Sequence, residues 1–466
     1  MRRITLRLTQ TQHEALRKHL LPGDGLEAVA IGLCGRRRGD EVHVFTLRTI
    51  VPIPYEECKV RQPDRVTWST DRLVPLLTEA QKRDLAVFKI HSHPGNYEKF
   101  SEVDDASDAD VFGSVAVWTE SDEPHCSTIM LGDGRIFGRA IFPDGSSRAL
   151  DSVLVAGDDL LFWPSLLNGN IPEFAQRHSQ LFGAGTTQRL RQLSIAVIGC
   201  SGTGSPLIEQ LARLGVGRLI LIDPDKIEEK NLNRIVNSTR DDANHSRYKV
   251  EVMARAIDAM GLGTVVVPLA ENLISRKVVE AVAQCDVVFG CMDSVEGRHL
   301  LNRLAACYVI PYFDLGVKLQ ADGRGGIDEA CAAVHYLRPD GSSLLDRRAY
   351  TLAQLKSEGL RRTDPAAYRD QVKAGYIHGV QEDRPAVVSI NTHVASCAVN
   401  ELLARLHPYR LDSNAESAVV RISFIQGVTY RESEPHPSGT FERVIGRGDS
   451  EPLLGMPELG RKERTE

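Results

Sequence analysis

The sequence predicts an α/β protein built from two folded halves of different construction. Residues 1–150 alternate short apolar strands with turns and helices. Residues 194–310 change to a strand–helix–strand rhythm, whose apolar runs are typical of buried parallel strands. With 466 residues, the chain is long enough for each half to bury a core of its own.

The composition excludes several classes of protein. Hydrophobic residues make up 42% and charged residues 25%, the net charge is −6, and there is no long basic run, so nucleic acid is not expected as a partner. No apolar stretch predicts a membrane span, and the basic N-terminus lacks the apolar core of a signal peptide. Nine scattered cysteines without a Cys-x-x-Cys pair favour reduced thiols and a cytoplasmic location.

The first half reads as a series of strands with a few helices. Apolar runs predict strands at 43–53, 85–93, 115–120 and 126–131, and the sequence GDGR after the last of them predicts a hairpin turn. One helix is expected over 101–112, and a second at 11–20 or 69–84.

The most informative stretch of the chain is HSHPGNYEKFSEVD, residues 91–104. Residues i and i+2 of a strand share one face, so His91 and His93 can point at one metal ion. Asp104 falls in the first turn of the helix that Ser101 begins, and it can turn back toward the histidines. Two imidazoles and a carboxylate leave one position open on a tetrahedral Zn2+ for a reactive water, which predicts a metallohydrolase. The alternatives are a surface histidine pair and a simple helix N-cap.

These residues, with Pro94, resemble the His-x-His-Pro-x6-Ser-x-x-Asp signature of the JAMM/MPN metallopeptidases, which are deubiquitinase-like enzymes. The resemblance implies a cytidine-deaminase-like α/β/α fold and a glutamate on an earlier strand, which Glu27 of LEAVAIGLCG matches. It further implies that His91, His93 and Asp104 are zinc ligands. Glu27 would be the general base, and Ser101 would donate a hydrogen bond to the oxyanion.

The second half opens with a strand, a glycine turn and a helix, in LSIAVIGCSGTGSPLIEQLARLGV. Gly199, Gly202 and Gly204 allow the backbone to approach a phosphate at the helix N-terminus, although Ser201 replaces the middle glycine of the usual pattern. Asp223 ends the next strand, where an acidic residue would bind ribose hydroxyls. By itself, this pattern also fits a generic dinucleotide site.

The residues after this turn are more specific: 222–234 read IDPDKIEEKNLNR, Lys249 follows in SRYKVEVMARAI, and Asp293 follows in FGCMDS. This arrangement resembles the ThiF/MoeB-like adenylating superfamily, which includes the ubiquitin-activating enzymes, over about 174–407. The resemblance implies a Rossmann-like fold that uses ATP and Mg2+ to attach AMP to a carboxylate. It implies ribose binding by Asp223, phosphate binding by Asn231, Arg234 and Lys249, and Mg2+ binding by Asp293. The nucleotide-binding set is Gly199, Gly202, Gly204, Asp223, Asp225, Asn231, Arg234, Lys249 and Asp293.

The same family carries an arginine six residues before a glycine, upstream of the glycine turn. Arg177 and Gly183 match this spacing, which implies a homodimer in which Arg177 reaches the nucleotide of the partner subunit. The alternative is an ordinary surface arginine.

Two departures from the family pattern bear on the downstream chemistry. Ser343 and Asp346 stand where many relatives have the first cysteine pair of a structural zinc site, so we expect no such zinc. No cysteine lies between Cys331 and Cys397, where a transfer cysteine would be expected. The adenylate would then pass directly to another protein, to Cys331, or to a hydroxyl as an oxyester, and buried packing remains the ordinary role of Cys331.

The domain organisation expected from these patterns has four parts. A metallopeptidase domain covers 1–150, a connector with the arginine-bearing helix covers 151–185, an adenylating domain covers 186–430, and a tail covers 431–466. The sequence does not assign the tail phrase VIGRGDSEPLLGMPEL, and packing against the second half is a guess.

Together, the two halves predict a bifunctional enzyme of bacterial ubiquitin-like conjugation. It would activate the C-terminus of a ubiquitin-like β-grasp protein and process or deconjugate the same protein as a zinc isopeptidase, with a separate cysteine-bearing conjugating enzyme as a further partner. One alternative is a sulfur-carrier substrate that is activated for thiocarboxylate formation, with the protease trimming its tail. Another is a non-catalytic scaffold that binds the ubiquitin-like protein.

Overall fold

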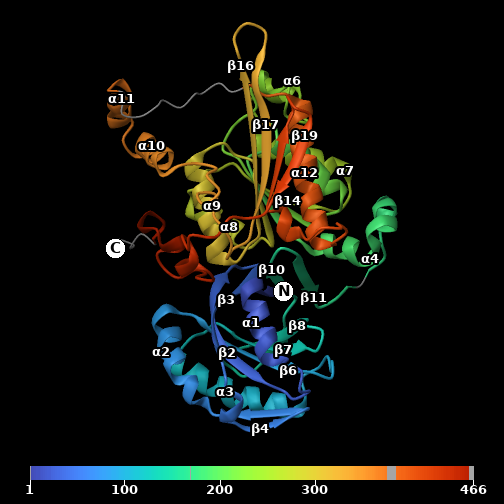
Figure 1. The fold of residues 1–466 in the computed structure, drawn as a ribbon, viewed down its shortest axis with the longest axis vertical. Coiled ribbons are helices and arrows are strands. Elements are labelled where there is room, and N and C mark those ends of the chain that lie inside the picture. Colours follow the sequence, from blue (N-terminus) through green and yellow to red (C-terminus); the bar gives the residue numbers. More distant parts are fainter. Residues whose placement is uncertain (1, 168, 375–384, 461–466) are drawn as a thin grey trace. The chain divides into compact units, whose positions relative to one another are not determined.

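The computed structural model describes residues 2–167, 169–374 and 385–460, and it confirms the mixed α/β fold (Figure 1). The chain divides into two compact units. Unit 1 comprises Met1–Leu167, Ala306–Val309 and Val444–Glu466, and unit 2 comprises Asn168–Ala305 and Ile310–Arg443. Each unit therefore contains segments that lie far apart in the sequence.

Unit 1 is organised around a nine-stranded mixed sheet in the order β11-β10-β1-β3-β2-β6-β7-β8-β9. Its strands are β1 (Arg3–Thr9), β2 (Val29–Arg38), β3 (Val42–Pro52), β6 (Ala86–His93), β7 (His125–Leu131), β8 (Ile136–Ile141), β9 (Ser147–Ala149), β10 (Ser152–Ala156) and β11 (Leu160–Pro164). The helices are α1 (Gln10–Leu20), α2 (Val74–Arg83) and α3 (Glu102–Thr119), and β4 (Cys58–Gln62) and β5 (Arg65–Trp68) form a separate hairpin.

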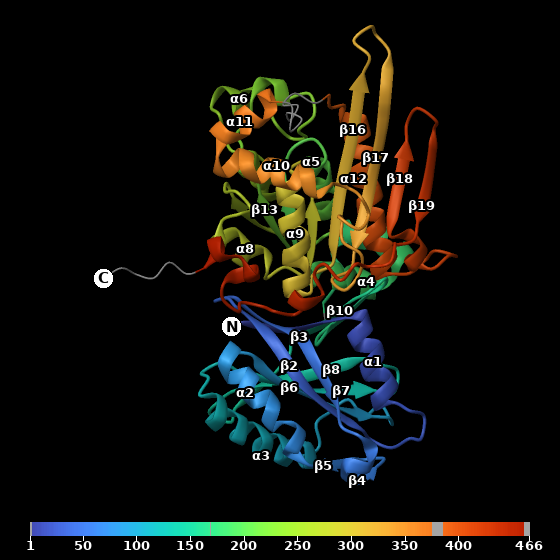
Figure 2. The same ribbon diagram turned by 60° about the vertical axis from the view of Figure 1, so that its left-hand side comes forward.

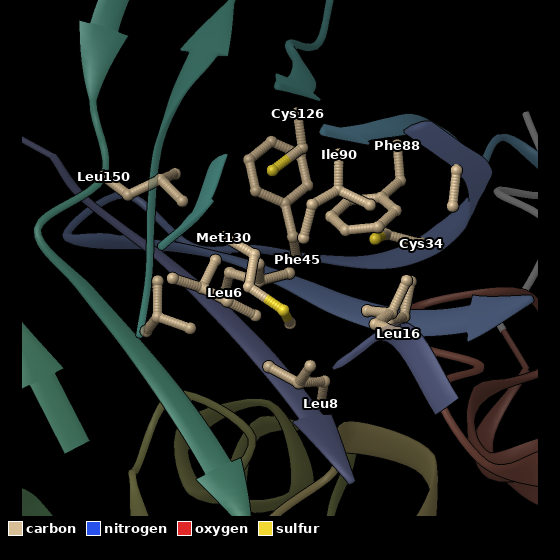
Figure 3. Close-up of a cluster of buried hydrophobic side chains, with 14 of the residues drawn as sticks. Leu6, Leu8, Leu16, Cys34, Phe45, Phe88, Ile90, Cys126, Met130 and Leu150 are labelled. Carbon is tan, nitrogen blue, oxygen red and sulfur yellow. The ribbon is translucent and has the colours of Figure 1, made fainter. Parts of the chain in front are cut away.

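Alternation along the central strands gives unit 1 two apolar layers. On one face of the sheet, Phe45, Phe88 and Met130 pack with Leu16 of α1 (Figure 3). On the other face, residues of α2 and α3 pack with Val87. Because side chains alternate between faces, Val87, His91 and His93 of β6 share the face that α3 covers.

The predicted strand at 115–120 is wrong, because α3 continues through it to Thr119. The reciprocal hydrogen bonds of Ser101 and Asp104 start the helix, and Val115 then faces the core while Val117 is 80% exposed. A run of β-branched and aromatic residues is a weak strand signal when a capped helix is already under way. The GDGR turn between β7 and β8 is confirmed, and both 10–20 and 74–83 are helical.

The first part of the stretch expected to be a connector, 151–167, belongs to the sheet of unit 1 instead. β10 pairs in parallel with β1, and β11 pairs antiparallel with β10. The apolar runs SVLVA and LLFWP thus add two strands at the sheet edge. Only from 168 onward does the chain enter unit 2, where α4 (Gln176–Gln192) begins.

The tail residues from 444 pack in unit 1, so the guess that they pack on the second half is wrong. The Asp449 N–H donates to the Arg36 carbonyl (2.7 Å), and the Arg38 N–H donates to Asp449 Oδ2 (2.8 Å). Arg37 Nη1 donates to the same carboxylate (3.2 Å), and the Tyr308 hydroxyl donates to its other oxygen (2.9 Å). Hydrogen bonds to the backbone of β2 therefore fix the tail, and its buried leucines, Leu453, Leu454 and Leu459, add apolar packing.

We expect Asp449→Ala to lower the free energy of unfolding of unit 1 by about 3 kcal/mol, since it removes the carboxylate that the buried Arg37 guanidinium contacts. All three tryptophans of the chain, Trp68, Trp118 and Trp163, lie in unit 1, so denaturation followed by tryptophan fluorescence reports on this unit. Glu458→Ala, which removes an exposed carboxylate of the tail, is the control. Equal unfolding midpoints for the two variants would show that Asp449 is dispensable.

Unit 2 contains an eight-stranded sheet in the order β14-β13-β12-β15-β16-β17-β18-β19 (Figure 2). Neighbouring strands are parallel from β14 to β16 and antiparallel from β16 to β19. The strands are β12 (Ser194–Ile198), β13 (Arg218–Ile222), β14 (Val265–Leu269), β15 (Val287–Gly290), β16 (Tyr312–Ala321), β17 (Ile327–Leu337), β18 (Val419–Ser423) and β19 (Val428–Glu432). The predicted parallel strands β12, β13 and β15 are thus present as the centre of a Rossmann-like arrangement.

The helices of the remaining described chain alternate with these strands or follow them. They are α5 (Gly204–Arg213), α6 (Arg240–Asn244), α7 (Lys249–Met260), α8 (Arg276–Val282), α9 (Val295–Tyr308), α10 (Leu352–Thr363), α11 (Pro365–Lys373) and α12 (Val388–Leu406). Within the described ranges, no helix combines the length and the hydropathy that crossing a membrane requires.

Candidate functional sites

His91, His93 and Asp104 converge in unit 1, and all three side chains are largely buried. The two Nε2 atoms of the histidines lie 3.1 Å apart, and Asp104 Oδ1 lies 2.9 Å from His91 Nε2. Asp104 Oδ2 lies 3.6 Å from His93 Nε2. The strand brings the histidines together and the first turn of α3 supplies the carboxylate, as the sequence predicts.

This cluster fits a zinc ion. Ligand atoms at zinc bond lengths in a tetrahedron lie about 3.3 Å apart, which falls within the spread of distances observed here. His93 Nδ1 donates to the Tyr97 carbonyl (2.7 Å), which leaves the Nε2 lone pair facing the cluster. Burial disfavours ionisation of Asp104, but the two neighbouring histidines and the hydrogen bond from the Ser101 N–H outweigh it and lower the carboxyl pKa, so the carboxylate is anionic.

Glu27 lies beside this cluster, directly before β2. Its Oε1 is 3.7 Å from His93 Nε2, and only 3% of the residue is exposed. The Ser92 N–H donates to the Ala28 carbonyl, and the Ala28 N–H donates to Ser92 Oγ, so backbone pairing holds Glu27 next to β6. Burial raises the pKa of Glu27 to about 8, so this carboxylate holds a proton more tightly than an ordinary glutamate does.

Ser101 is the N-cap of α3, so the N-cap alternative considered for this residue is also correct. Its N–H and its hydroxyl both donate to Asp104 Oδ2 (2.7 Å each), and its hydroxyl accepts from the Asp104 N–H (3.2 Å). The cap therefore orients the carboxylate that faces the histidines. The role of Ser101 as a donor to an oxyanion stays a prediction.

Sequence reasoning missed a second polar network behind the cluster. Lys89 Nζ donates to Asp108 Oδ1 (2.7 Å), and Arg139 donates to the other oxygen of the same carboxylate. Lys89 shares its strand face with His91, and Asp108 lies one helical turn after Asp104, so this ion pair fixes α3 against β6. The spacing Lys89-x-His91 indicated that the lysine lies on the same strand face as the histidines, but the sequence did not reveal that Asp108 is its partner.

In unit 2, the glycine turn connects β12 to α5 and needs glycine for steric reasons. Gly199 has a positive φ of 93°, and a Cβ there would lie 2.7 Å from the Cys291 carbonyl oxygen. At Gly204 a Cβ would lie 1.8 Å from the Gly199 carbonyl oxygen. At Gly202 a Cβ would lie only 2.3 Å from Asn391 Nδ2, so the missing side chain makes room for an amide from α12.

Asp223, Asp225 and Lys249 meet at the carboxyl end of β13. The Cys200 N–H donates to Asp223 Oδ2 (2.8 Å), and the Asp225 N–H donates to Asp223 Oδ1 (2.9 Å), so Asp223 also orients the glycine turn. Lys249 Nζ lies 2.7 Å from Asp225 and 3.7 Å from Asp223. Burial raises the pKa of Asp223, and the lysine charge opposes this shift.

The other predicted nucleotide residues lie around this edge of the sheet. Asn231 is buried, and its Oδ1 accepts from the Glu228 N–H (3.0 Å). The stem of Arg234 passes close to the glycine turn, because its Cδ lies 3.5 Å from the position that a Cβ of Gly202 would take. Asp293 is exposed in the loop after β15, at the same edge as Gly199, because the Cys291 N–H donates to the Ile198 carbonyl (2.7 Å).

Arg177 is not part of this cluster as far as the described contacts show. Its side chain is exposed on the first turns of α4, before the break in the helix at Gly183 (φ 78°). Contribution to a partner subunit stays a prediction.

Cys331 lies on β17 and is half-buried. Burial and the neighbouring Glu329, which accepts from its thiol (3.3 Å), raise its pKa, and such a thiol is a poor nucleophile. Ser343 and Asp346, at the positions of a missing cysteine pair, bond to each other, with the hydroxyl donating to the carboxylate (2.8 Å).

The geometry agrees with comparisons to known families. The model of the ThiF family matches residues 175–437, and the model of prokaryotic homologs of the JAB domain matches residues 9–133. The chain is 35% identical to the adenylyltransferase and sulfurtransferase MOCS3 of Danio rerio over 113 residues, which is 24% of each protein. It is 32% identical over 146 residues to ubiquitin-like modifier-activating enzyme 5 of Drosophila willistoni, covering 29% of this chain and 35% of that one.

A third relative, the SAMP-activating enzyme E1 of Haloferax volcanii, is 34% identical over 123 residues, covering 26% of this chain and 45% of that one. The chain therefore spans about a quarter to under a half of the length of these relatives. Among solved structures, MccB of E. coli with ATP aligns with a TM-score of 0.44 and 18% identity over 59% of this chain and 75% of that one. The chain belongs to the ThiF family, and ahead of its ThiF region it carries a domain of the prokaryotic JAB type.

Proposed function

We propose that unit 2 adenylates the C-terminal carboxylate of a ubiquitin-like β-grasp protein, and that unit 1 cleaves peptide or isopeptide bonds at the same C-terminus. The observation that carries the first activity is the meeting of Asp223 and Lys249 beside the glycine turn, inside the region that matches the ThiF family. The observation that carries the second is the His91, His93 and Asp104 cluster with Glu27 beside it.

In the adenylation step, an oxygen of the substrate carboxylate forms a bond to the α-phosphorus of ATP, and the bond to pyrophosphate breaks. Negative charge builds up on the phosphate oxygens, and the cationic groups of Lys249 and Arg234 offset it. Asp223 accepts from the ribose hydroxyls. Asp293 would hold Mg2+, which supplies further neutralising charge when bound.

In the hydrolytic step, His91, His93 and Asp104 would hold Zn2+, which supplies an activated water and polarises the carbonyl when bound. Glu27 accepts the proton of the attacking water and passes it to the leaving amine. Ser101 donates to the developing oxyanion.

A direct test mixes the full chain, as the Glu27→Gln variant, with a ubiquitin-like protein of verified C-terminus, ATP and Mg2+, and follows AMP and the intact masses. AMP formation with an adduct that thiol removes indicates a cysteine, and an adduct that yields only to hydroxylamine indicates an oxyester. A bound adenylate without an adduct indicates hand-off to a separate conjugating enzyme. Absence of both AMP and adenylate contradicts the adenylation activity.

A sulfur-carrier substrate is the second candidate. MOCS3 of Danio rerio is an adenylyltransferase and sulfurtransferase, and the raised pKa of Cys331 argues against a transfer thiol in this chain. In that case a sulfurtransferase, and not a conjugating enzyme, consumes the adenylate. A scaffold without catalysis is disfavoured because the ligand positions of both sites are filled with suitable residues.

We propose further that the protein is a homodimer through unit 2, with Arg177 acting on the partner's nucleotide. The cytoplasm is its proposed location, in line with the nine free cysteines.

Zinc binding at the His91, His93 and Asp104 cluster is expected to raise the stability of unit 1 against denaturation. We expect Zn2+ at a hundredfold excess over its dissociation constant to stabilise unit 1 by about 2.7 kcal/mol, because the ion binds the folded cluster. Tryptophan fluorescence during denaturation measures the effect, and a chelator reverses it. His91→Ala should abolish the zinc-dependent shift, whereas His178→Ala in unit 2 should leave it intact. A shift that survives His91→Ala would place the ion elsewhere.

A further inference from the structure

Asn391 is a buried asparagine whose side chain has no hydrogen-bond partner in its own helix or in the described elements packed around it. It lies in the first turn of α12, and only 4% of the residue is exposed. Within the part of the chain that the structure describes, its carboxamide makes no hydrogen bond, and its polar atoms are not completely shielded from solvent. Amides in such largely buried positions are nearly always paired, so an unpaired one is available to a ligand that can reach it.

The amide is aimed at the glycine turn. Asn391 Nδ2 lies 2.3 Å from the position that a Cβ of Gly202 would take, so only glycine leaves room for it there. Arg234 Cδ lies 3.5 Å from the same position, which places the stem of a cationic side chain beside the amide. Two donors from separate elements thus flank one buried backbone position.

The helix that follows the turn has an open N-terminus. α5 starts at Gly204, its N-cap Thr203 gives no side-chain hydrogen bond to the N–H groups of the first turn, and Pro206 in that turn has no N–H. An uncapped helix N-terminus with a positive dipole end favours an anion, and phosphate oxygens accept hydrogen bonds from amides. The feature that completes the site is the unpaired amide of Asn391, which points into it.

We propose that Asn391 is a phosphate ligand of the nucleotide site, donating from Nδ2 to a phosphate oxygen held at the N-terminus of α5. This rests on the proposed adenylation activity, since it places ATP at the glycine turn. It adds to the predicted set a residue that lies far from the glycine turn in the sequence. Asn391 contacts the substrate, whereas Gly202 acts by leaving space for it.

The test is calorimetric titration of the full-length protein with ATP in Mg2+, and separately with adenosine. Asn391→Ala should weaken ATP binding roughly tenfold, and Asn391→Asp roughly a hundredfold because it sets a carboxylate against phosphate. Adenosine binding should not change in either variant. Asn400→Asp places the same substitution on an exposed position of the same helix and should bind ATP as the wild type does.

The outcomes separate this inference from the proposed function. If the wild type fails to bind ATP, the adenylation activity itself is contradicted. If the wild type binds ATP and Asn391→Asp binds it equally well, Asn391 is not a phosphate ligand. Equal losses for ATP and adenosine would also overturn the inference, because they indicate a structural defect, and thermal unfolding of each variant checks this independently.

Discussion

Lys249→Met is expected to lower the rate of adenylate formation roughly a hundred- to a thousandfold, which is the effect of removing one preorganised charged donor from a transition state. The Lys249 side chain is 7% exposed and lies between Asp223 and Asp225, so its charge is held in a partly desolvated position. Methionine keeps the unbranched apolar stem, so the variant should lose the charge and retain the packing.

Pyrophosphate exchange measures this effect without a downstream partner. Lys277→Met removes an exposed lysine of unit 2, whose side chain is 68% exposed, and should leave the exchange rate unchanged. A Lys249→Met protein that folds and exchanges pyrophosphate at the wild-type rate would exclude a role of Lys249 in phosphate chemistry.

Glu27→Gln is expected to reduce cleavage of a ubiquitin-like fusion by roughly a hundred- to ten-thousandfold, which is the contribution of a positioned general base. Glutamine has nearly the same shape, and the buried carboxyl group already has a raised pKa, so the fold should tolerate the neutral side chain. This substitution leaves His91, His93 and Asp104 in place, so the zinc stabilisation proposed for unit 1 should persist.

Two controls make the second result specific. Glu14→Gln changes an exposed glutamate of α1 and should cleave normally. His91→Ala should lose both cleavage and zinc stabilisation, in contrast to Glu27→Gln, which should lose cleavage alone. Cleavage by Glu27→Gln at the wild-type rate would show that another group accepts the proton.

The sequence predicted the parts of both sites that depend on short-range spacing. His91 and His93 converge because a strand repeats every two residues, and Asp104 joins them because Ser101 caps the next helix. Glu27 could be predicted only from the family resemblance, since its approach to His93 depends on the pairing of Val29 with His91 across β2 and β6.

Contacts between distant segments were beyond sequence reasoning. Asn391 reaches Gly202 only because α12 packs on α5, and nothing in the surrounding sequence marks it. The guess that the tail phrase packs on the second half was wrong because the contacts of Asp449 with β2 join segments about 410 residues apart, and no local pattern in the sequence predicts them. The strand prediction at 115–120 failed because local propensity was outweighed by a helix that had already begun.

The membership of residues 444–460 in unit 1 has a consequence for biosynthesis. The ribosome makes residues 1–167 first, but the segment that covers β2 emerges only after all of residues 168–443 have been made. Unit 1 therefore completes its hydrogen bonding late in translation. A premature stop anywhere in 168–443 would yield a truncated chain that carries the histidine pair but lacks the Asp449 carboxylate. In that chain the backbone groups of β2 that the tail pairs with would be exposed to chaperones and proteases.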